Sequence, residues 1–306
     1  MKRINFSIVT LLVVAMTLLF ASCTKDGVYK PKKKIAKIYE TVLTDPNNND
    51  KMLKEEWKWD GKLLSSITYH YGTIVETTEV ATFTYDKNQL TTITLGDTRM
   101  ELTYDGKLIE TMKSYSDNEL EATYTFEHGD KNRITGYKVE YNNTAKSNVA
   151  KNACLIESAF RFLIPEIATS EAKEYVKTAT DQRKDNRNYS VTMTYDGKNV
   201  ASKTITYSNG STECTYAYTE YKNPFYGLLS DENNNATSKN AVSQMVVKNP
   251  LLPVYANSPD YTYTYTYKTD GKVPTQVIEQ LEWTLTVGTT TTSHNEKIQT
   301  DYEFVD

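Results

Sequence analysis

The densest run of chemically capable side chains is a row of tyrosines at every second position near the C-terminus. Tyr261, Tyr263, Tyr265 and Tyr267 alternate with threonines, so in a β-strand the four rings share one face over about 20 Å, at roughly 3.4 Å per residue. With Trp283 on the next expected strand, this face predicts a stacking platform for a carbohydrate or another flat ligand. The same spacing also suits tyrosines that form the core of a wide barrel. We favour the core interpretation, and both stay open at this level.

The other titratable residues form no catalytic pattern. His70, His128 and His294 fall in different expected hairpins, without metal-ligand spacing and without a nucleophile motif. The loop at 45–50 alternates Asp and Asn as a calcium loop does, but it has Asp50 at the place that requires glycine. We therefore expect no enzyme activity, no metal and no cofactor, and we interpret this loop as a hairpin connection.

Two cysteines lie in the body of the chain, Cys154 and Cys214. In an exported protein they would meet an oxidising compartment, where a disulfide between them could join distant segments. A bridge requires the two Cα atoms to approach within about 7 Å, which the sequence does not determine. A disulfide and two buried free thiols therefore both remain open, and we favour the free thiols.

The N-terminus has the features of an export signal. Lys2 and Arg3 precede an apolar run over residues 8–20, which is shorter than a typical membrane-spanning helix. The run closes on small residues and Cys23. This segment resembles a bacterial lipoprotein box, in which the cysteine becomes the lipidated first residue of the mature chain.

The lipoprotein resemblance implies three consecutive segments. Residues 1–22 would be the signal peptide, Cys23 would carry the lipid, and residues 23–34 would form a flexible, lysine-rich tether. Thr24 directly after the cysteine implies anchoring in the outer membrane, by the usual sorting logic of bacterial lipoproteins. The periplasmic and cell-surface faces both remain open.

Composition restricts the partners. The chain has 35 basic and 39 acidic residues, a formal net charge of −4, and it shows no basic stripe beyond the tether. Nucleic acid is therefore an unfavourable partner. The same pattern of short apolar segments and turns runs through residues 35–306 without a linker, which predicts one domain.

Four Asp-Gly pairs, each close behind an aromatic residue and followed by Lys, divide the chain into hairpins, at 60–61, 105–106, 196–197 and 270–271. Asp-Gly between alternating apolar segments predicts a type I′ turn, with positive φ at both central residues, whereas Gly96-Asp97 predicts a type II′ turn. We count on the order of fifteen strands, which is too many for a flat sheet. The sequence thus predicts an all-β antiparallel meander curled into a barrel or half-barrel.

Two segments depart from this pattern. Residues 153–180 carry apolar residues at helical spacing on both sides of Pro165, which predicts two short helices. Such an insertion commonly covers an edge or an end of a sheet, and a lid over a site is the alternative. Residues 222–258 read as a long irregular connection.

A family resemblance accompanies these features. The repeated Tyr-Asp-Gly-Lys hairpins, the segment at 223–228 and the stretch at 265–275 look like a Bacteroidetes lipoprotein family, a domain of unknown function described as having a porin-like fold. The resemblance covers nearly all of the chain beyond Cys23 and implies a barrel. It implies no activity.

The strands do not resemble those of a membrane porin. Lipid-facing positions of such barrels form an apolar band, whereas these segments place Thr, Lys and Glu between their apolar residues. We therefore expect a water-soluble barrel attached to the outer membrane by a lipid. The expected function is a ligand-binding module of the cell envelope, for a glycan or a peptide; the alternative is a structural or assembly component that docks other envelope proteins.

Overall fold

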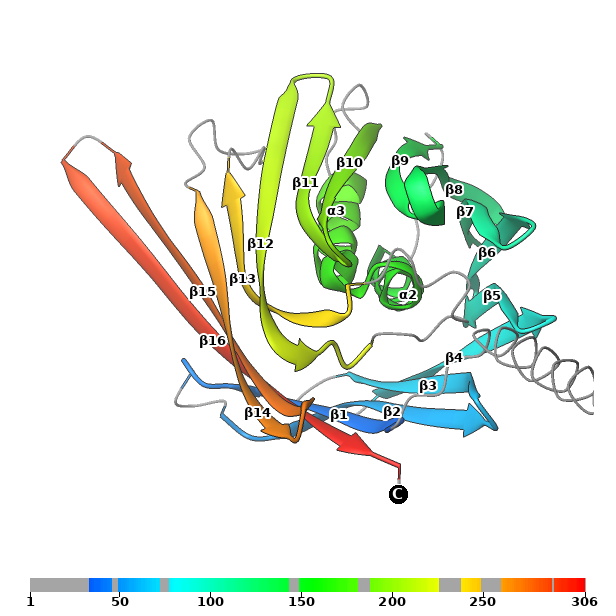
Figure 1. Ribbon diagram of the computed structural model, residues 1–306, viewed down its shortest axis with the longest axis horizontal. Helices are drawn as coiled ribbons and strands as arrows, with labels where there is room; N and C mark the ends of the chain where they lie inside the picture. Colours follow the sequence, from blue (N-terminus) through cyan, green and yellow to red (C-terminus); the bar gives the residue numbers. More distant parts are fainter. Residues whose placement is uncertain are drawn as a thin grey trace, which may run out of the picture.

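The computed structural model describes residues 33–45, 49–71, 77–142, 149–180, 188–225, 238–248, 260–287 and 289–305. Within these residues sixteen antiparallel strands follow one another around a closed barrel (Figure 1). Pairing of Ile35 with Phe304 and of Val42 with Ile298 joins the first strand to the last. The predicted all-β meander is confirmed, and it is a complete barrel.

The elements follow the chain in order. The first nine strands are β1 (Ile35–Val42), β2 (Met52–Asp60), β3 (Leu63–Tyr71), β4 (Thr77–Asp86), β5 (Gln89–Leu95), β6 (Thr98–Asp105), β7 (Leu108–Ser116), β8 (Glu119–His128) and β9 (Ile134–Tyr141). The helices are η1 (Asp130–Asn132), α2 (Val149–Leu163), η2 (Pro165–Ile167) and α3 (Ala168–Thr180). The remaining strands are β10 (Tyr189–Asp196), β11 (Asn199–Tyr207), β12 (Gly210–Lys222), β13 (Asn240–Lys248), β14 (Tyr261–Asp270), β15 (Val273–Val287) and β16 (Thr290–Phe304).

On strand β6, the alternation of side chains separates an apolar inner face from a polar outer face. On β6, Met100 and Leu102 are buried, whereas Arg99, Glu101 and Thr103 lie on the opposite face and are partly or fully exposed. Successive side chains of a strand point to opposite faces of the sheet, so this period of two places the apolar set inside the barrel. The exterior is therefore compatible with water.

The Asp-Gly hairpins have a different turn from the one predicted. Asp60 still pairs with Leu63, so the two central residues of this turn are Gly61 and Lys62. Of these two, Gly61 has positive φ, at +54°, and positive φ at the first central residue is the pattern of a type II′ turn. The type I′ prediction was wrong because the aspartate belongs to the last pair of the ladder. The predicted Gly96 turn is confirmed, with φ +61° at the glycine.

A repeated contact explains the aromatic residue of each hairpin. The pairing of β4 with β5 skips Thr91, a β-bulge just after Leu90, and the Leu90 carbonyl accepts a 2.8 Å hydrogen bond from Tyr104 Oη of the next hairpin. The same contact recurs at other bulges, in the pairs Trp59 with Ile35, Tyr85 with Leu64, His128 with Ile109, Tyr195 with Ile134, Tyr218 with Val200 and Tyr267 with Val242. At each β-bulge a backbone carbonyl loses its regular partner in the sheet, and the aromatic residue of the next hairpin donates a hydrogen bond to it.

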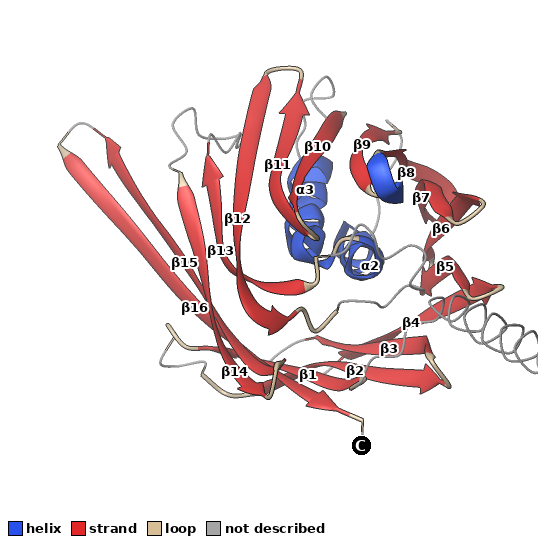
Figure 2. Ribbon diagram, viewed as in Figure 1, coloured by secondary structure: helices blue, strands red, loops and turns tan. Residues whose placement is uncertain are grey.

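The helical insertion lies inside the barrel (Figure 2). Phe160 of α2 is fully buried against the rings of Tyr124, Phe126 and Tyr137 on β8 and β9, and Phe162 packs on Phe83 of β4. The prediction that the helices cover an edge or end of the sheet was therefore wrong. A closed sixteen-stranded barrel leaves a wide interior, and the two amphipathic helices occupy part of it.

One further segment differs from the sequence prediction. The stretch at 222–258, predicted to be an irregular connection, contains strand β13, whose Ala241, Met245 and Val247 are buried on one face. Helix α3 begins at Ala168, on the C-terminal side of Pro165 as predicted, and Ser170 Oγ donates to the carbonyl of Ile167 within its first turn.

Candidate binding cavity between the helices and the tyrosine strand

The helices occupy the barrel unevenly, and a cavity of about 620 Å³ remains beside them. Its wall runs from α2 and α3 to the inner faces of β11–β16 and β1. A smaller apolar cluster, formed by Cys214, Met245, Val247 and Tyr263, packs on the strand side. This volume lies within the range of about 300–1,000 Å³ that is typical of small-molecule sites.

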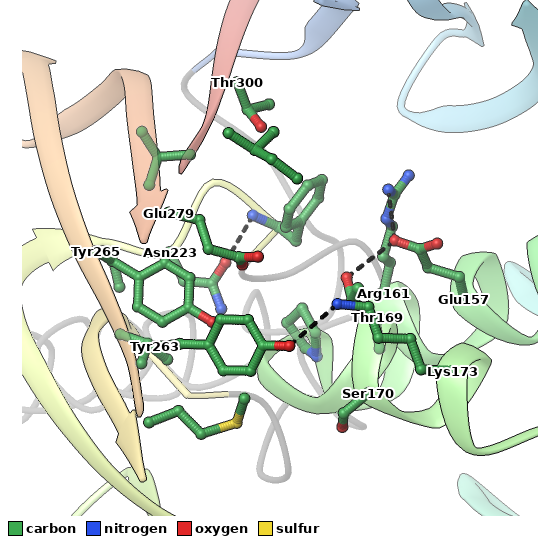
Figure 3. A pocket seen from close by; sticks show the side chains of 18 of the residues that line it. Glu157, Arg161, Thr169, Ser170, Lys173, Asn223, Tyr263, Tyr265, Glu279 and Thr300 are labelled. Carbon is green, nitrogen blue, oxygen red and sulfur yellow. Dashed lines mark hydrogen bonds and ion pairs between the residues drawn. The ribbon is translucent and has the colours of Figure 1, made fainter. Parts of the chain in front are cut away.

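The predicted tyrosine row forms one wall of this cavity. Tyr261, Tyr263, Tyr265 and Tyr267 all line it, on the inner face of β14. Figure 3 shows the rings of Tyr263 and Tyr265 in this wall. The rings of Tyr263 and Tyr265 are stacked, with centroids 6.4 Å apart and planes 22° apart. The two interpretations from the sequence therefore overlap, because the rings face the barrel interior yet border open space.

Trp283 is placed differently from the tyrosines. It lies opposite Tyr261 in the ladder between β14 and β15, as expected for the neighbouring strand. Its ring stacks on His294 of β16, with centroids 5.2 Å apart and planes 16° apart. This pair lies beyond the residues that line the cavity, so the structure does not bring Trp283 to the proposed platform.

Lys173 reaches the tyrosine wall from α3. Its Nζ donates to Tyr263 Oη at 3.3 Å and lies 5.2 Å from the centroid of the same ring. Burial lowers the pKa of Lys173, but Tyr263 and Glu279 outweigh this effect and leave the pKa above its ordinary value. Lys173 is therefore an ammonium group that the cavity already holds against an aromatic ring.

Two carboxylates face the same space from the strands. Glu279 of β15 pairs with Tyr265 in the ladder, and Glu40 comes from β1. Burial raises the pKa of the Glu279 carboxyl, and the charge of Lys173 and the Tyr265 hydroxyl partly offset this shift. Burial likewise raises the pKa of Glu40, partly offset by Lys54 at 3.9 Å.

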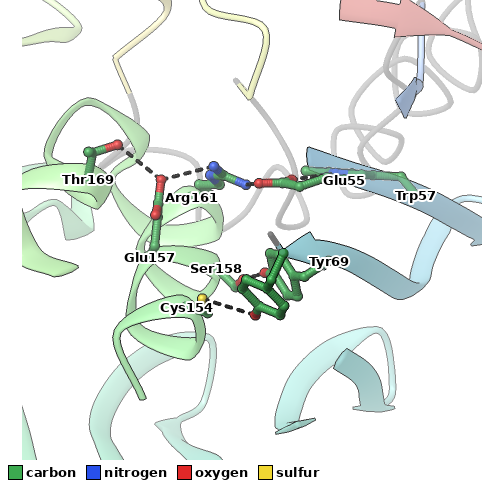
Figure 4. A network of polar contacts seen from close by, with 9 residues as sticks. Glu55, Trp57, Tyr69, Cys154, Glu157, Ser158, Arg161 and Thr169 are labelled. Atoms are coloured by element: carbon green, nitrogen blue, oxygen red, sulfur yellow. Dashed lines mark hydrogen bonds and ion pairs between the residues drawn. The ribbon is translucent and has the colours of Figure 1, made fainter. Parts of the chain in front are cut away.

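Arg161 anchors the helices to the barrel at the edge of the cavity (Figure 4). Its guanidinium lies 2.7 Å from Glu55 of β2 and 2.9 Å from Glu157 of α2. Glu55 also accepts a 2.8 Å hydrogen bond from Trp57 Nε1, and Glu157 accepts one from Thr169 Oγ1 at 3.0 Å. Because the guanidinium lies between two carboxylates that each accept a further hydrogen bond, this network has a positioning role.

Chemically, the cavity combines ring faces with charged and hydrogen-bonding groups, which is suited to binding a small polar ligand. Within the part of the chain that the structure describes, no three His, Cys, Asp or Glu side chains are grouped to hold a metal ion. The polar groups from α3, β1 and β15 have no motif in the sequence, because the closed barrel brings them together from distant positions. The alternation of Tyr and Thr along β14 was the sequence signal that identified its tyrosines.

The two cysteines in the body of the chain, Cys154 and Cys214, are free thiols. Cys154 lies on α2 with Sγ 3.4 Å from Tyr71 Oη, and Cys214 belongs to the cluster beside the cavity. Cys23, like the predicted signal peptide, lies outside the described residues.

Comparisons with known proteins find similar structures but no similar sequence. No family model matches the chain, and no curated protein sequence matches it. Among the described residues, no helix has both the length and the apolar character needed to span a membrane. In structure the chain is similar to a porin-like protein from Bacteroides uniformis, with TM-score 0.51 and 10% identity over 89% of this chain and 98% of the other. It also matches a porin-like protein from Bacteroides vulgatus, with TM-score 0.45 and 10% identity over 89% of this chain and 99% of the other. At this identity the likeness to the first protein extends to the fold alone.

Proposed function

We propose that this protein is a ligand-binding module of the cell envelope, which takes a small glycan or peptide into its barrel. The cavity between α3 and the tyrosine face of β14 carries this proposal. Stacked rings offer a surface for the flat face of a sugar or a side chain, and Lys173 and Glu279 offer directional polar contacts. The interior is wide enough for a ligand because the helices leave this side of it open.

The polar exterior of the barrel supports the proposal that water, and not lipid, surrounds it. Membrane barrels present an apolar band to lipid. On the described strands and their ends, the exposed large apolar side chains are few and scattered: Leu43, Val80 and Val305. We infer attachment by a lipid on Cys23 to the outer membrane, with the body of the barrel outside the bilayer. The fold of the porin-like protein from Bacteroides uniformis is compatible with an envelope protein.

A binding screen tests the proposed function. Purified protein lacking residues 1–22 is titrated with a panel of envelope and dietary oligosaccharides and short peptides, and heat of binding is measured. We expect a ligand whose affinity falls at least tenfold in Tyr265→Ala, and by less in Tyr265→Phe, which keeps the ring.

Tyr115→Ala is the matched control for that screen. Tyr115 lies on the exterior beside Arg99, whose guanidinium carbon lies 4.2 Å from the ring centroid. Its loss should leave affinity unchanged. If no ligand of the panel binds the wild type more tightly than Tyr265→Ala, the proposal that the cavity is the binding site is wrong.

One observation favours the alternative, a docking component. The hairpin of β15 and β16 projects beyond the rest of the barrel (Figure 1). β15 pairs with β14 as far as Trp283, and β16 pairs with β1 as far as Ile298. Beyond these positions the two strands continue to pair with each other. No other strand that the structure describes pairs with their outer edges there, which suits pairing with a partner strand.

Photo-crosslinking separates this alternative from the first. A crosslinking residue at Thr291, on the projecting hairpin, should capture an envelope protein in cells, and one at Thr103, on the opposite part of the barrel exterior, should not. Equal labelling at both positions would argue against docking through the hairpin.

A further inference from the structure

The tyrosine wall of the cavity continues onto the projecting hairpin of β15 and β16. Tyr261, which lines the cavity at the start of β14, lies directly opposite Trp283 in the ladder between β14 and β15. Residues that pair directly across two strands carry their side chains on the same face of the sheet. Trp283 therefore shares the inner face of the sheet with the tyrosines, although it lies just beyond the cavity itself.

The projecting part of β15 is amphipathic. On its inner face Trp283 and Leu285 are half-buried, and Leu285 lies beyond the last pair that β15 makes with β14. The residues that alternate with them on the outer face are exposed, namely Glu282, Thr284 and Thr286. Apolar side chains that gather on one face of a strand mark an interaction surface. The inner face of the hairpin is thus the side that is suited to receive a partner.

The chemistry of this inner face matches that of the cavity wall. The indole of Trp283 stacks on the imidazole of His294, and His294 Nε2 lies 3.7 Å from a Glu296 carboxylate oxygen. The side chains of His294 and Glu296 are 42% and 43% exposed. A flat aromatic pair beside exposed polar groups offers stacking and hydrogen bonds together, as the tyrosines and their polar neighbours do inside the cavity.

The continuous surface is longer than a single small ligand. Tyr265 and Tyr261 are four residues apart on β14, which corresponds to about 14 Å at roughly 3.4 Å per residue. Trp283 lies one strand further, about 5 Å across the sheet. Aromatic side chains recur along this route, at Tyr265, Tyr263, Tyr261 and Trp283. Such a row fits a ligand built of repeated flat rings.

From this continuity we propose that the inner face of the hairpin is an outer subsite, and that the ligand is a linear oligosaccharide. Its inner end lies against the tyrosines of the cavity, and its outer end stacks on Trp283. The inference rests on the proposed binding function and specifies the ligand class of that site. Because the outer sugar is joined to one that is already bound, its contacts add to the affinity. Affinity therefore increases with the length of the sugar chain.

Calorimetric titration with sugars of two lengths tests the outer subsite. The probes are the disaccharides and hexasaccharides of β-1,4-linked glucose, α-1,4-linked glucose and β-1,4-linked N-acetylglucosamine. We expect the hexasaccharide of at least one series to bind about tenfold more tightly than its disaccharide. Trp283→Ala should remove this gain and leave the affinity for the disaccharide unchanged, whereas Tyr265→Ala should weaken binding of both.

Thr284→Ala is the matched control, because Thr284 is exposed on the outer face of the same strand; it should keep the whole gain. Trp283→Phe, which retains a ring, should keep part of it. Circular dichroism melting of each variant establishes that it is folded.

Equal wild-type affinities for the two lengths, or an unchanged gain in Trp283→Ala, would overturn the outer subsite while leaving the cavity as a binding site. Loss of the product crosslinked at Thr291 in Trp283→Ala, with the gain unchanged, would assign the face to a protein partner instead. Absence of binding by every oligosaccharide would overturn the ligand class, and the peptides of the wider panel then decide separately whether the cavity binds anything.

Discussion

At the scale of single residues, the most consequential polar contact is the ion pair of Lys203 with Glu171. Both side chains are completely buried, and Lys203 also donates to Ser170 Oγ at 2.8 Å. Lys203→Met would leave Glu171 as a buried, unpaired carboxylate, so we expect a loss of about 3–5 kcal/mol in the free energy of unfolding. Chemical denaturation measures this loss.

The matched control for Lys203 is Lys272→Met. Lys272 lies 3.7 Å from Glu220 on the exterior, with most of both side chains exposed, so its loss should cost less than about 1 kcal/mol. The double variant Lys203→Met with Glu171→Gln should recover part of the stability. A single Lys203→Met variant as stable as the wild type would disprove the role of this pair.

Glu121 predicts a dependence of stability on pH. This buried carboxylate accepts hydrogen bonds from Tyr175 Oη, at 2.8 Å, and from Asn152 Nδ2. Burial raises its pKa above the ordinary value, and these two donors partly offset the shift. Its stabilising contribution is therefore complete below the unfolded-state pKa and is lost as the pH rises through the folded-state pKa.

We expect the unfolding free energy of the wild type, relative to that of Glu121→Gln, to fall as the pH rises from about 4 towards 7. Denaturation curves at a series of pH values measure the difference. Glu119→Gln, at an exposed site, is the control, and its unfolding free energy should change with pH in the same way as that of the wild type. A constant difference between the wild type and Glu121→Gln would contradict the prediction.

At the scale of elements, the contact between each aromatic residue and the preceding bulge predicts a common cost. Tyr104→Phe keeps the ring but leaves the carbonyl of the buried Leu90 without its hydrogen bond, so we expect a loss of about 1–2 kcal/mol. Tyr115→Phe, on the exterior, should change stability little. Equal unfolding midpoints for the two variants would mean that the bulge carbonyls do not depend on these hydroxyls.

Helix α2 has a measurable role as a filler of the barrel interior. Phe160→Ala removes a ring that contacts aromatic residues of β8 and β9, and a cavity of this kind costs about 3–5 kcal/mol. Phe160→Leu should cost less, and Val176→Ala, at an exposed site on α3, should cost little. Thermal melting ranks the three variants, and a Phe160→Ala variant that melts with the wild type would contradict this role.

At the scale of the whole molecule, the proposed anchor separates the barrel from the bilayer. Cys23→Ala should lose incorporation of a fatty-acid probe and should shift the protein from the membrane fraction to the soluble fraction, because the outer faces of the described strands are polar. Cys214→Ala, inside the barrel, is the control and should keep both properties. Membrane association of Cys23→Ala equal to that of the wild type would refute the anchor.

The elements that depend on local sequence were predictable, for a physical reason. Period-two alternation and glycine-containing turns determine strands and hairpins within a few residues, and helical spacing around Pro165 determines the paired helices. The turn type at Gly61 escaped prediction because it depends on whether Asp60 joins the ladder. β13 escaped because its short apolar alternation stands between stretches that contain Asn and Pro and read as an irregular connection.

The sequence by itself determined the antiparallel meander, the alternating tyrosine face and the inserted helices, because each arises from contacts between near neighbours along the chain. The tertiary structure alone decided that β1 meets β16, that the helices enter the barrel, and that Lys173, Glu40 and Glu279 share one cavity with the tyrosines. These outcomes depend on closure of the barrel, which joins residues from opposite ends of the chain. No local sequence pattern shows which distant residues will meet. The candidate site could therefore be identified from the tertiary structure and not from the sequence.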